Sequence, residues 1–343
     1  MSRNGPGPTP QPGFDPVEGA EASAAILRAW RARVADQLLR PFGSGARKRL
    51  RRLRLGLRAL SGQAGGGWFI PYRHARPHLR SAYPALEPVF REAAPRMTAL
   101  LEEIGRLRTP LRAIPPSGPG LRWGQSWFPR LDAATAYAMT RRLRPARIIE
   151  IGSGHSTRFL TRALADMGGD AAALLAIDPA PRATLADTGA RHIAALVEDV
   201  DRGLFAGLAA NDILFIDSSH IAMPGSDVDV LLLDVLPRLP AGVYVHIHDV
   251  FLPDPYPESW TWRGYNEQTV VGALLQGGAY ELVFASHWAG RNLPEQIQAA
   301  VGWLPLEAGA METSLWLRKT AAPAAGQVDG QVTGQVSGRA HPV

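Results

Sequence analysis

Residues 148–156 constrain the fold of this chain more than any other segment. Residues 148–151 are a short apolar run that includes one acid, which is typical of a buried parallel strand. Gly152 and Gly154 follow at once, and glycines permit a tight turn and a close approach of the backbone to a ligand. A hydroxyl side chain at 156 or 157 can then cap a helix. The segment therefore predicts a strand, a binding loop and a helix in succession.

The spacing of this loop is Glu-x-Gly-x-Gly, which resembles part of a dinucleotide-binding fingerprint. Ser156 stands where that fingerprint has its third glycine, so the match is incomplete. Two interpretations follow from the loop alone. It binds the polar end of a nucleotide-like ligand, or it is a tight turn that binds nothing.

The segments downstream repeat the alternation of strands and helices. Three largely apolar runs lie at 174–177, 212–216 and 243–247, and helical patterns separate them. They are followed directly by Asp178, by Asp217, and by His248 and Asp249, respectively. This pattern predicts an α/β protein with a doubly wound sheet. Ligands of such sheets bind outside the carboxyl ends of the strands, where all of these polar residues fall.

These motifs together resemble the class I S-adenosylmethionine-dependent methyltransferases, and among them the bacterial small-molecule O-methyltransferase type. The resemblance covers about residues 120–318 and includes two late apolar segments at 281–285 and 314–317. It implies a Rossmann-like sheet of seven strands, with the last strand antiparallel. It also implies an enzyme that transfers a methyl group from S-adenosylmethionine to a small molecule such as a sugar, a polyketide or a phenol.

The resemblance implies a cofactor site around the glycine loop, with the ribose hydroxyls bound by Asp178 and the adenine near Asp199 at the next strand end. Asp199 is equally compatible with an exposed loop acid. Gly154 is also a candidate for a positive φ angle. A carboxylate beside the loop suits a sulfonium cofactor better than a diphosphate, which favours the methyl donor over NAD. The predicted cofactor-binding residues are Glu150, Gly152, Ser153, Gly154, His155, Ser156, Asp178 and Asp199.

The resemblance to catechol-type members implies a second site, in which Asp217, His248 and Asp249 hold a divalent metal and His220 is the general base. Histidine titrates near neutral pH and suits that role. The predicted catalytic residues are therefore His220, Asp217 and Asp249. A histidine ligand is unusual for magnesium, so a metal-free methyltransferase remains an alternative, as do an NAD-binding oxidoreductase and a binding protein without activity. Because His246 and His248 share one face of the sheet, one of them is expected to pack against a helix.

Composition limits the other possibilities. The 343 residues contain no cysteine, which excludes disulfides and thiol catalysis, and we expect a cytoplasmic protein because no signal peptide or membrane span is visible. The net charge of +6 is concentrated in residues 46–58, where leucines recur at helical spacing. That segment is compatible with peripheral binding to an anionic membrane or with docking on the catalytic domain. A nucleic-acid partner is not expected.

The expected organisation has four parts. A disordered tail covers residues 1–20 and an N-terminal helical region, interrupted by Pro95, covers 21–115. The methyltransferase domain covers 116–320, and a low-complexity tail covers 321–343. Two aromatic-rich stretches, 123–128 and 251–265, are candidates for the substrate site or for packing onto the core, and the second is a candidate lid. Asn266 and Glu267 are predicted to cap the next helix or to contact the substrate.

Overall fold

The computed structural model describes residues 82–181 and 185–321, together with positions 46, 50, 53, 54, 56 and 57. The chain divides into two compact units, Met1–Ala75 and Arg76–Val343. All described positions of the first unit are helical. The remainder of the basic segment 46–58 and nearly all of the two predicted tails lie outside the described residues. Within the described part of the chain, no helix is both long enough and apolar enough to cross a bilayer.

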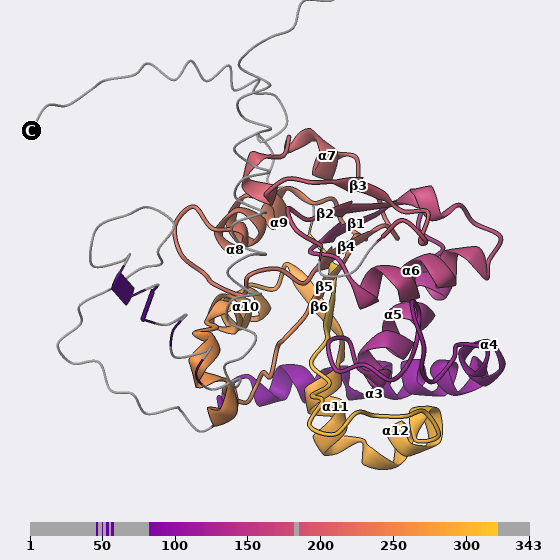
Figure 1. Ribbon diagram of the computed structural model, residues 1–343. Coiled ribbons are helices and arrows are strands. Elements are labelled where there is room, and N and C mark those ends of the chain that lie inside the picture. The colour runs from indigo at the N-terminus through magenta and orange to yellow at the C-terminus, as the bar shows by residue number, and fades with distance from the viewer. Residues whose placement is uncertain are drawn as a thin grey trace, which may run out of the picture. The chain divides into compact units, whose positions relative to one another are not determined.

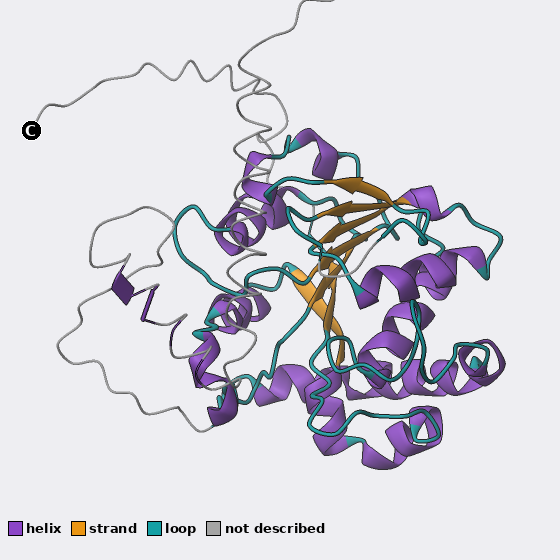
Figure 2. Ribbon diagram, in the orientation of Figure 1, coloured by secondary structure: helices purple, strands orange, loops and turns teal. Residues whose placement is uncertain are grey.

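The second unit is built on one mixed sheet of seven strands in the order β3-β2-β1-β4-β5-β7-β6 (Figures 1 and 2). Five strands run parallel in β3-β2-β1-β4-β5, and β7 is antiparallel to both β5 and β6. This arrangement confirms the predicted Rossmann-like sheet and its antiparallel last strand. The strands are β1 (Ile148–Ile151), β2 (Leu174–Ile177), β3 (Arg191–Ile193), β4 (Ile213–Ile216), β5 (Tyr244–Ile247), β6 (Tyr280–Ala285) and β7 (Leu315–Lys319).

The register of the central strands places their carboxyl ends level with one another. Ile151 pairs with Ile177 on one side and with Ile216 on the other, and Ile216 pairs with Ile247. The residues that follow β1, β2, β4 and β5 therefore meet at one edge of the sheet. This edge carries the candidate site.

Helices cover both faces of the sheet (Figure 1). Helices α5 and α6 lie on one face, and α8, α9 and α10 lie on the other. Residues 230–235 between α8 and α9 are π-helical. The α-helices of the second unit are α3 (Glu87–Arg106), α4 (Arg108–Arg112), α5 (Arg130–Leu143), α6 (His155–Ala165), α7 (Gly203–Ala206), α8 (Asp227–Asp229), α9 (Leu236–Arg238), α10 (Glu267–Gln276), α11 (Ser286–Asn292) and α12 (Pro294–Val301).

Helix α3 corrects one expectation, because it continues through Pro95 instead of being interrupted there. Proline removes one backbone donor from a helix interior and costs stability. The stripe formed by Phe90, Met97 and Ile104 is fully buried on both sides of the proline. Burial of this continuous apolar stripe offsets the lost hydrogen bond, so the helix does not end.

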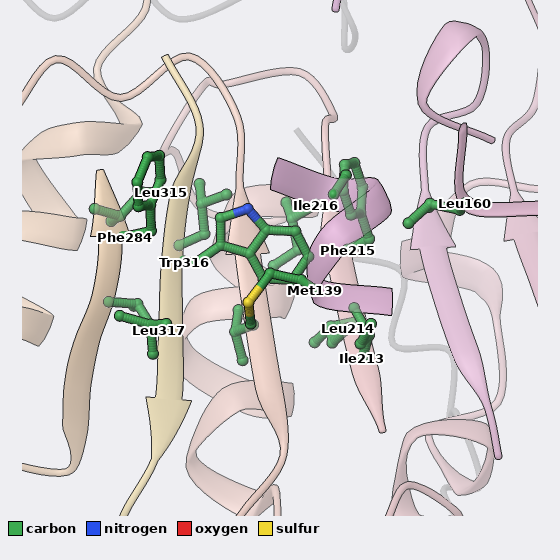
Figure 3. Packing of buried hydrophobic residues seen from close by; sticks show 14 of the residues in the cluster. Met139, Leu160, Ile213, Leu214, Phe215, Ile216, Phe284, Leu315, Trp316 and Leu317 are labelled. Carbon is green, nitrogen blue, oxygen red and sulfur yellow. The ribbon is translucent and has the colours of Figure 1, made fainter. Parts of the chain in front are cut away.

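The core of the unit includes the apolar side chains of the central strands and of α5. Trp316 of β7, Phe215 of β4 and Met139 of α5 are all fully buried in this core (Figure 3), and the ring centroids of Trp316 and Phe215 lie 6.0 Å apart. His246 of β5 stacks on Phe215 with ring centroids 3.7 Å apart, and its Nε2 lies 2.8 Å from Ser314 Oγ. His246 is therefore the histidine of the pair that packs in the core, with its ring on Phe215 of β4 and near Trp316 of β7 rather than on a helix, and His248 remains for the site.

Candidate active site

The glycine loop after β1 approaches the end of β4 so closely that a side chain has no room at its first glycine. Gly152 has a φ of +78°, and a Cβ added there would lie 2.0 Å from the carbonyl oxygen of Asp217. Gly154 differs, since its φ is 166° and a Cβ there would meet nothing within 4 Å. The left-handed conformation is therefore at Gly152 and not at Gly154, where it was expected. The backbone of the loop borders open space at Gly154.

Glu150 lies beneath this loop and holds it to the start of α6. Its side chain is fully buried and accepts hydrogen bonds of 2.6 Å from both the Ser156 and Thr157 hydroxyls. The Thr157 oxygen in turn accepts from the backbone nitrogen of Gly154 at 3.0 Å. Burial raises the pKa of Glu150 to about 8, so the carboxyl group is largely neutral at pH 7. Its observed role is to support the loop.

Asp178, directly after β2, binds the glycine loop through Ser153. Its Oδ2 accepts from both the backbone nitrogen and the hydroxyl of Ser153 at 2.8 Å, and its Oδ1 accepts from the Ala180 nitrogen. The side chain is half-buried. A carboxylate has about four lone-pair positions, so Asp178 retains capacity to accept further hydrogen bonds from a ligand.

The remaining two residues predicted to bind the cofactor are His155 and Asp199. His155 opens α6, and burial, aided by Arg122 and Arg158, lowers its pKa to about 4. Asp199 is not at a strand end, because β3 ends at Ile193 and a short 3₁₀ helix carries Asp199 with an exposed side chain. The three-residue strand is too short to extend to that position.

The ends of β4 and β5 bring the predicted catalytic residues together. His220 Nε2 lies 3.4 Å from Asp217 Oδ1 and 3.6 Å from Asp249 Oδ2. His248 Nδ1 lies 3.5 Å from Asp217 Oδ1 and also 3.5 Å from Asp249 Oδ1. Both imidazoles therefore face the same two carboxylates. Asp217, with 31% of its side chain exposed, lies on the solvent side of this cluster.

Two buried carboxylates stand behind the histidines. Glu267, the first residue of α10, approaches His220 Nδ1 at 2.9 Å. Asp132 of α5 approaches His248 Nε2 at 3.3 Å and accepts from the backbone nitrogens of Thr313 and Ser314. Sequence reasoning considered Glu267 only as a helix cap or a substrate contact, and it missed Asp132. The signal in the sequence that could have identified Asp132 is an acidic residue among the apolar residues of a predicted helix.

The charges of this cluster depend on each other. Burial opposes protonation of His248, yet Asp217 and Asp249 raise its pKa well above the usual value. Burial likewise opposes protonation of His220, yet Asp217 and Glu267 raise its pKa well above the usual value. Burial would raise the pKa of Asp217, but the two histidines hold it well below its usual value. The structure therefore favours imidazolium–carboxylate pairs at neutral pH.

The backbone of the cluster is strained at two positions. His220 has a φ of +62° and Asp249 has a φ of +57°. Residues other than glycine rarely adopt this region, and such strain is concentrated at functional sites. Asp249 also accepts from the Thr313 hydroxyl at 3.1 Å, which helps to hold it in place.

The two aromatic stretches have different positions. Trp123 and Phe128 of the first stretch are buried in the core, where both rings lie against Phe159. Tyr265 at the end of the second stretch is half-buried, with its ring centroid 4.5 Å from that of His220. Arg263 lies over Trp260 at 3.9 Å. The second stretch therefore borders the histidine cluster beside His220. Trp123 and Phe128 belong to the core, and Phe128 also borders the cluster, with its ring centroid 5.4 Å from that of His248.

Residues 149–250, which contain the glycine loop and the ends of β4 and β5, match the family model of a methyltransferase domain. The matched segment is a class I methyltransferase domain. This finding confirms the resemblance to the class I methyltransferases, and the family implies S-adenosylmethionine as the methyl donor. A search of curated proteins gives no significant match.

The geometry of the methyltransferase domain fits the implied donor at the glycine loop. The open space beside Gly154 leaves room for the aminoacid end of a ligand, and Asp178 offers a carboxylate to a diol. Both lie at the carboxyl edge of the parallel strands, where ligands of such sheets bind. These residues would hold the cofactor.

The predicted metal-binding residues fit their implied ligand less well than the residues of the glycine loop fit the methyl donor. Asp217, His248 and Asp249 are close together, as predicted, but among the described residues no group of three or more histidines and acids is arranged to hold an ion. The side chains instead pair with one another and with Asp132. The predicted metal site is therefore not confirmed in the described part of the chain.

Proposed function

We propose that this chain is an S-adenosylmethionine-dependent O-methyltransferase of a small hydroxylated molecule and that it needs no metal. The observation that supports the proposal is His220, whose ring lies between Glu267 and the pair formed by Asp217 and Asp249 at the strand ends. An imidazole at this edge is within reach of a hydroxyl bound beside the methyl donor. Phenols, sugars and polyketides all present such a hydroxyl.

Each part of the site then has a defined task. When bound, S-adenosylmethionine supplies an electrophilic methyl group. The loop at 152–154 and Asp178 hold the donor, and His220 takes the proton of the acceptor hydroxyl. Tyr265, beside the ring of His220, restricts access of water to the acceptor. Transfer of radiolabelled methyl groups to a panel of phenols, sugars and polyketides tests the proposal, and absence of both transfer and donor binding would refute it.

Replacement of Asp178 by alanine tests the donor site. We expect the binding free energy of S-adenosylmethionine to weaken by about 1.5–3 kcal/mol, the range for hydrogen bonds to a charged group. Calorimetric titration measures this change. Asp170→Ala is the matched control, because Asp170 precedes the same strand at its opposite end and only caps a short 3₁₀ helix. Equal affinities of the Asp178 variant and the wild type would remove Asp178 from the donor site.

Removal of divalent ions tests the metal-free mechanism. We expect dialysis against EDTA to leave the rate of methyl transfer unchanged, because His220 and not a bound cation assists loss of the proton. Rates are measured before chelation, after it, and after addition of Mg²⁺, Mn²⁺ or Zn²⁺. A loss of activity that one of these ions restores would establish a metal-assisted mechanism in its place.

A further inference from the structure

His220 is held by the first turn of a helix that lies far away in the sequence. Glu267 at the start of α10 is fully buried, and its Oε2 lies 2.9 Å from His220 Nδ1. Its second oxygen, Oε1, is buried and has no hydrogen-bond partner. Among the described residues, the hydrogen-bond partner of the Glu267 side chain is therefore His220. An acid buried with one oxygen unpaired is costly to the fold.

The backbone of the helix start is fastened to the same histidine. The backbone nitrogens of Asn266 and Glu267 both donate to the His220 carbonyl oxygen, at 3.1 and 3.2 Å. The Asn266 side chain accepts from the Ala222 nitrogen at 2.7 Å and donates to the Ala222 oxygen at 3.1 Å. These four hydrogen bonds fix the segment 220–222 against α10. The contact between Glu267 and the ring is a separate feature, because the other bonds do not involve the Glu267 side chain.

A carboxylate at Nδ1 determines which nitrogen of the ring can accept a proton. Burial raises the pKa of Glu267, while its contact with His220 opposes this rise. An ionised carboxylate only accepts hydrogen bonds, so Nδ1 carries its hydrogen when Glu267 is ionised. The lone pair of a neutral ring is then on Nε2, which faces Asp217 and Asp249. Asp217 is the partly exposed member of this group, so Nε2 is directed toward the side from which an acceptor arrives.

We propose that Glu267 is a positioning residue that fixes the orientation and tautomer of His220, so that Nε2 accepts the proton of the acceptor hydroxyl. This inference rests on the proposed function of His220. In this role Glu267 acts through His220 and not by contact with donor or acceptor. Its contribution therefore depends entirely on the presence of His220.

The test replaces Glu267 by alanine and by glutamine. Carboxylates that orient a functional histidine contribute about tenfold to a hundredfold in metal sites. We expect Glu267→Ala to lower kcat by about that factor, with KM for the acceptor and Kd for S-adenosylmethionine within about twofold of the wild type. Glu267→Gln, which is nearly equal in size, carries the test if the alanine variant does not fold, and a smaller loss of kcat is expected because its amide oxygen still accepts from Nδ1.

Two further variants separate this role from a structural one. Asn266→Ala removes the side-chain bonds to Ala222 but keeps the Glu267 contact, so we expect kcat to change less than threefold. In the His220→Ala background, Glu267→Ala should have no further effect on kcat, since its action passes through the ring. Independent, multiplying losses of kcat in the double variant would overturn the proposal, as would an Asn266→Ala loss as large as that of Glu267→Ala. A His220→Ala variant with full activity would instead refute the proposed function.

Discussion

Replacement of His220 by alanine is expected to lower kcat by about a hundredfold to ten-thousandfold, the usual contribution of a general base. Binding of S-adenosylmethionine should be unchanged, because the loop at 152–154 is held by Glu150 and Asp178 and not by His220. Single-turnover methyl transfer and calorimetry measure the two quantities. His246→Ala is the matched control. That histidine is equally buried but stacks on Phe215, so its loss should lower the free energy of unfolding and leave kcat intact.

The pH dependence of the same variant gives a second test. Burial opposes protonation of His220, but Asp217 and Glu267 raise its pKa well above the ordinary value, so the ring is protonated at neutral pH. A base must be neutral before it accepts a proton. The wild-type rate should therefore increase as pH rises to the pKa of His220. The deficit of the alanine variant should shrink at still higher pH, where the acceptor ionises unaided, and a constant ratio of rates across pH would contradict base catalysis.

Sequence reasoning predicted six of the seven strands because each of these six carries a local signal, whereas the short and largely exposed strand β3 carries none. Runs such as 148–151 and 213–216 are apolar and end in polar residues or glycines. Parallel strands bring those ends to one edge, so the meeting of Asp217 with His248 and Asp249 also followed from the pattern. These strands and the edge that carries the site are thus encoded locally, whereas the number of seven strands came from the family resemblance.

The contacts of the two histidines with Asp132 and Glu267 cannot be predicted from local sequence patterns. Asp132 meets His248 across 116 residues, and Glu267 meets His220 across 47. Both acids are on helices, and the packing of those helices, not any local pattern, decides which side chain they face. The charge state of Glu150 could not be predicted from the sequence either, because it depends on burial in the folded protein. Its burial makes it largely neutral at pH 7, so the argument that its charge would repel a diphosphate loses force.

The largest expected effect on donor binding comes from Gly154. A Cβ at this position meets nothing within 4 Å, so the protein itself tolerates a side chain there. The open space is where we place the aminoacid end of S-adenosylmethionine. Gly154→Val should therefore abolish detectable binding of the donor in calorimetry while the thermal unfolding temperature stays close to that of the wild type.

Gly152 is the matched position in the same loop, and the opposite pattern is expected there. A Cβ would lie 2.0 Å from the Asp217 carbonyl oxygen, and the φ of +78° alone costs a residue other than glycine about 1–2 kcal/mol. Gly152→Ala should therefore lower the free energy of unfolding by more than that amount and also displace Asp217 from His220. Thermal or urea unfolding measures this loss. If Gly154→Val bound the donor as tightly as the wild type, the cofactor would not lie over this loop. If Gly152→Ala were as stable as the wild type, the close approach of the loop to β4 would be wrong.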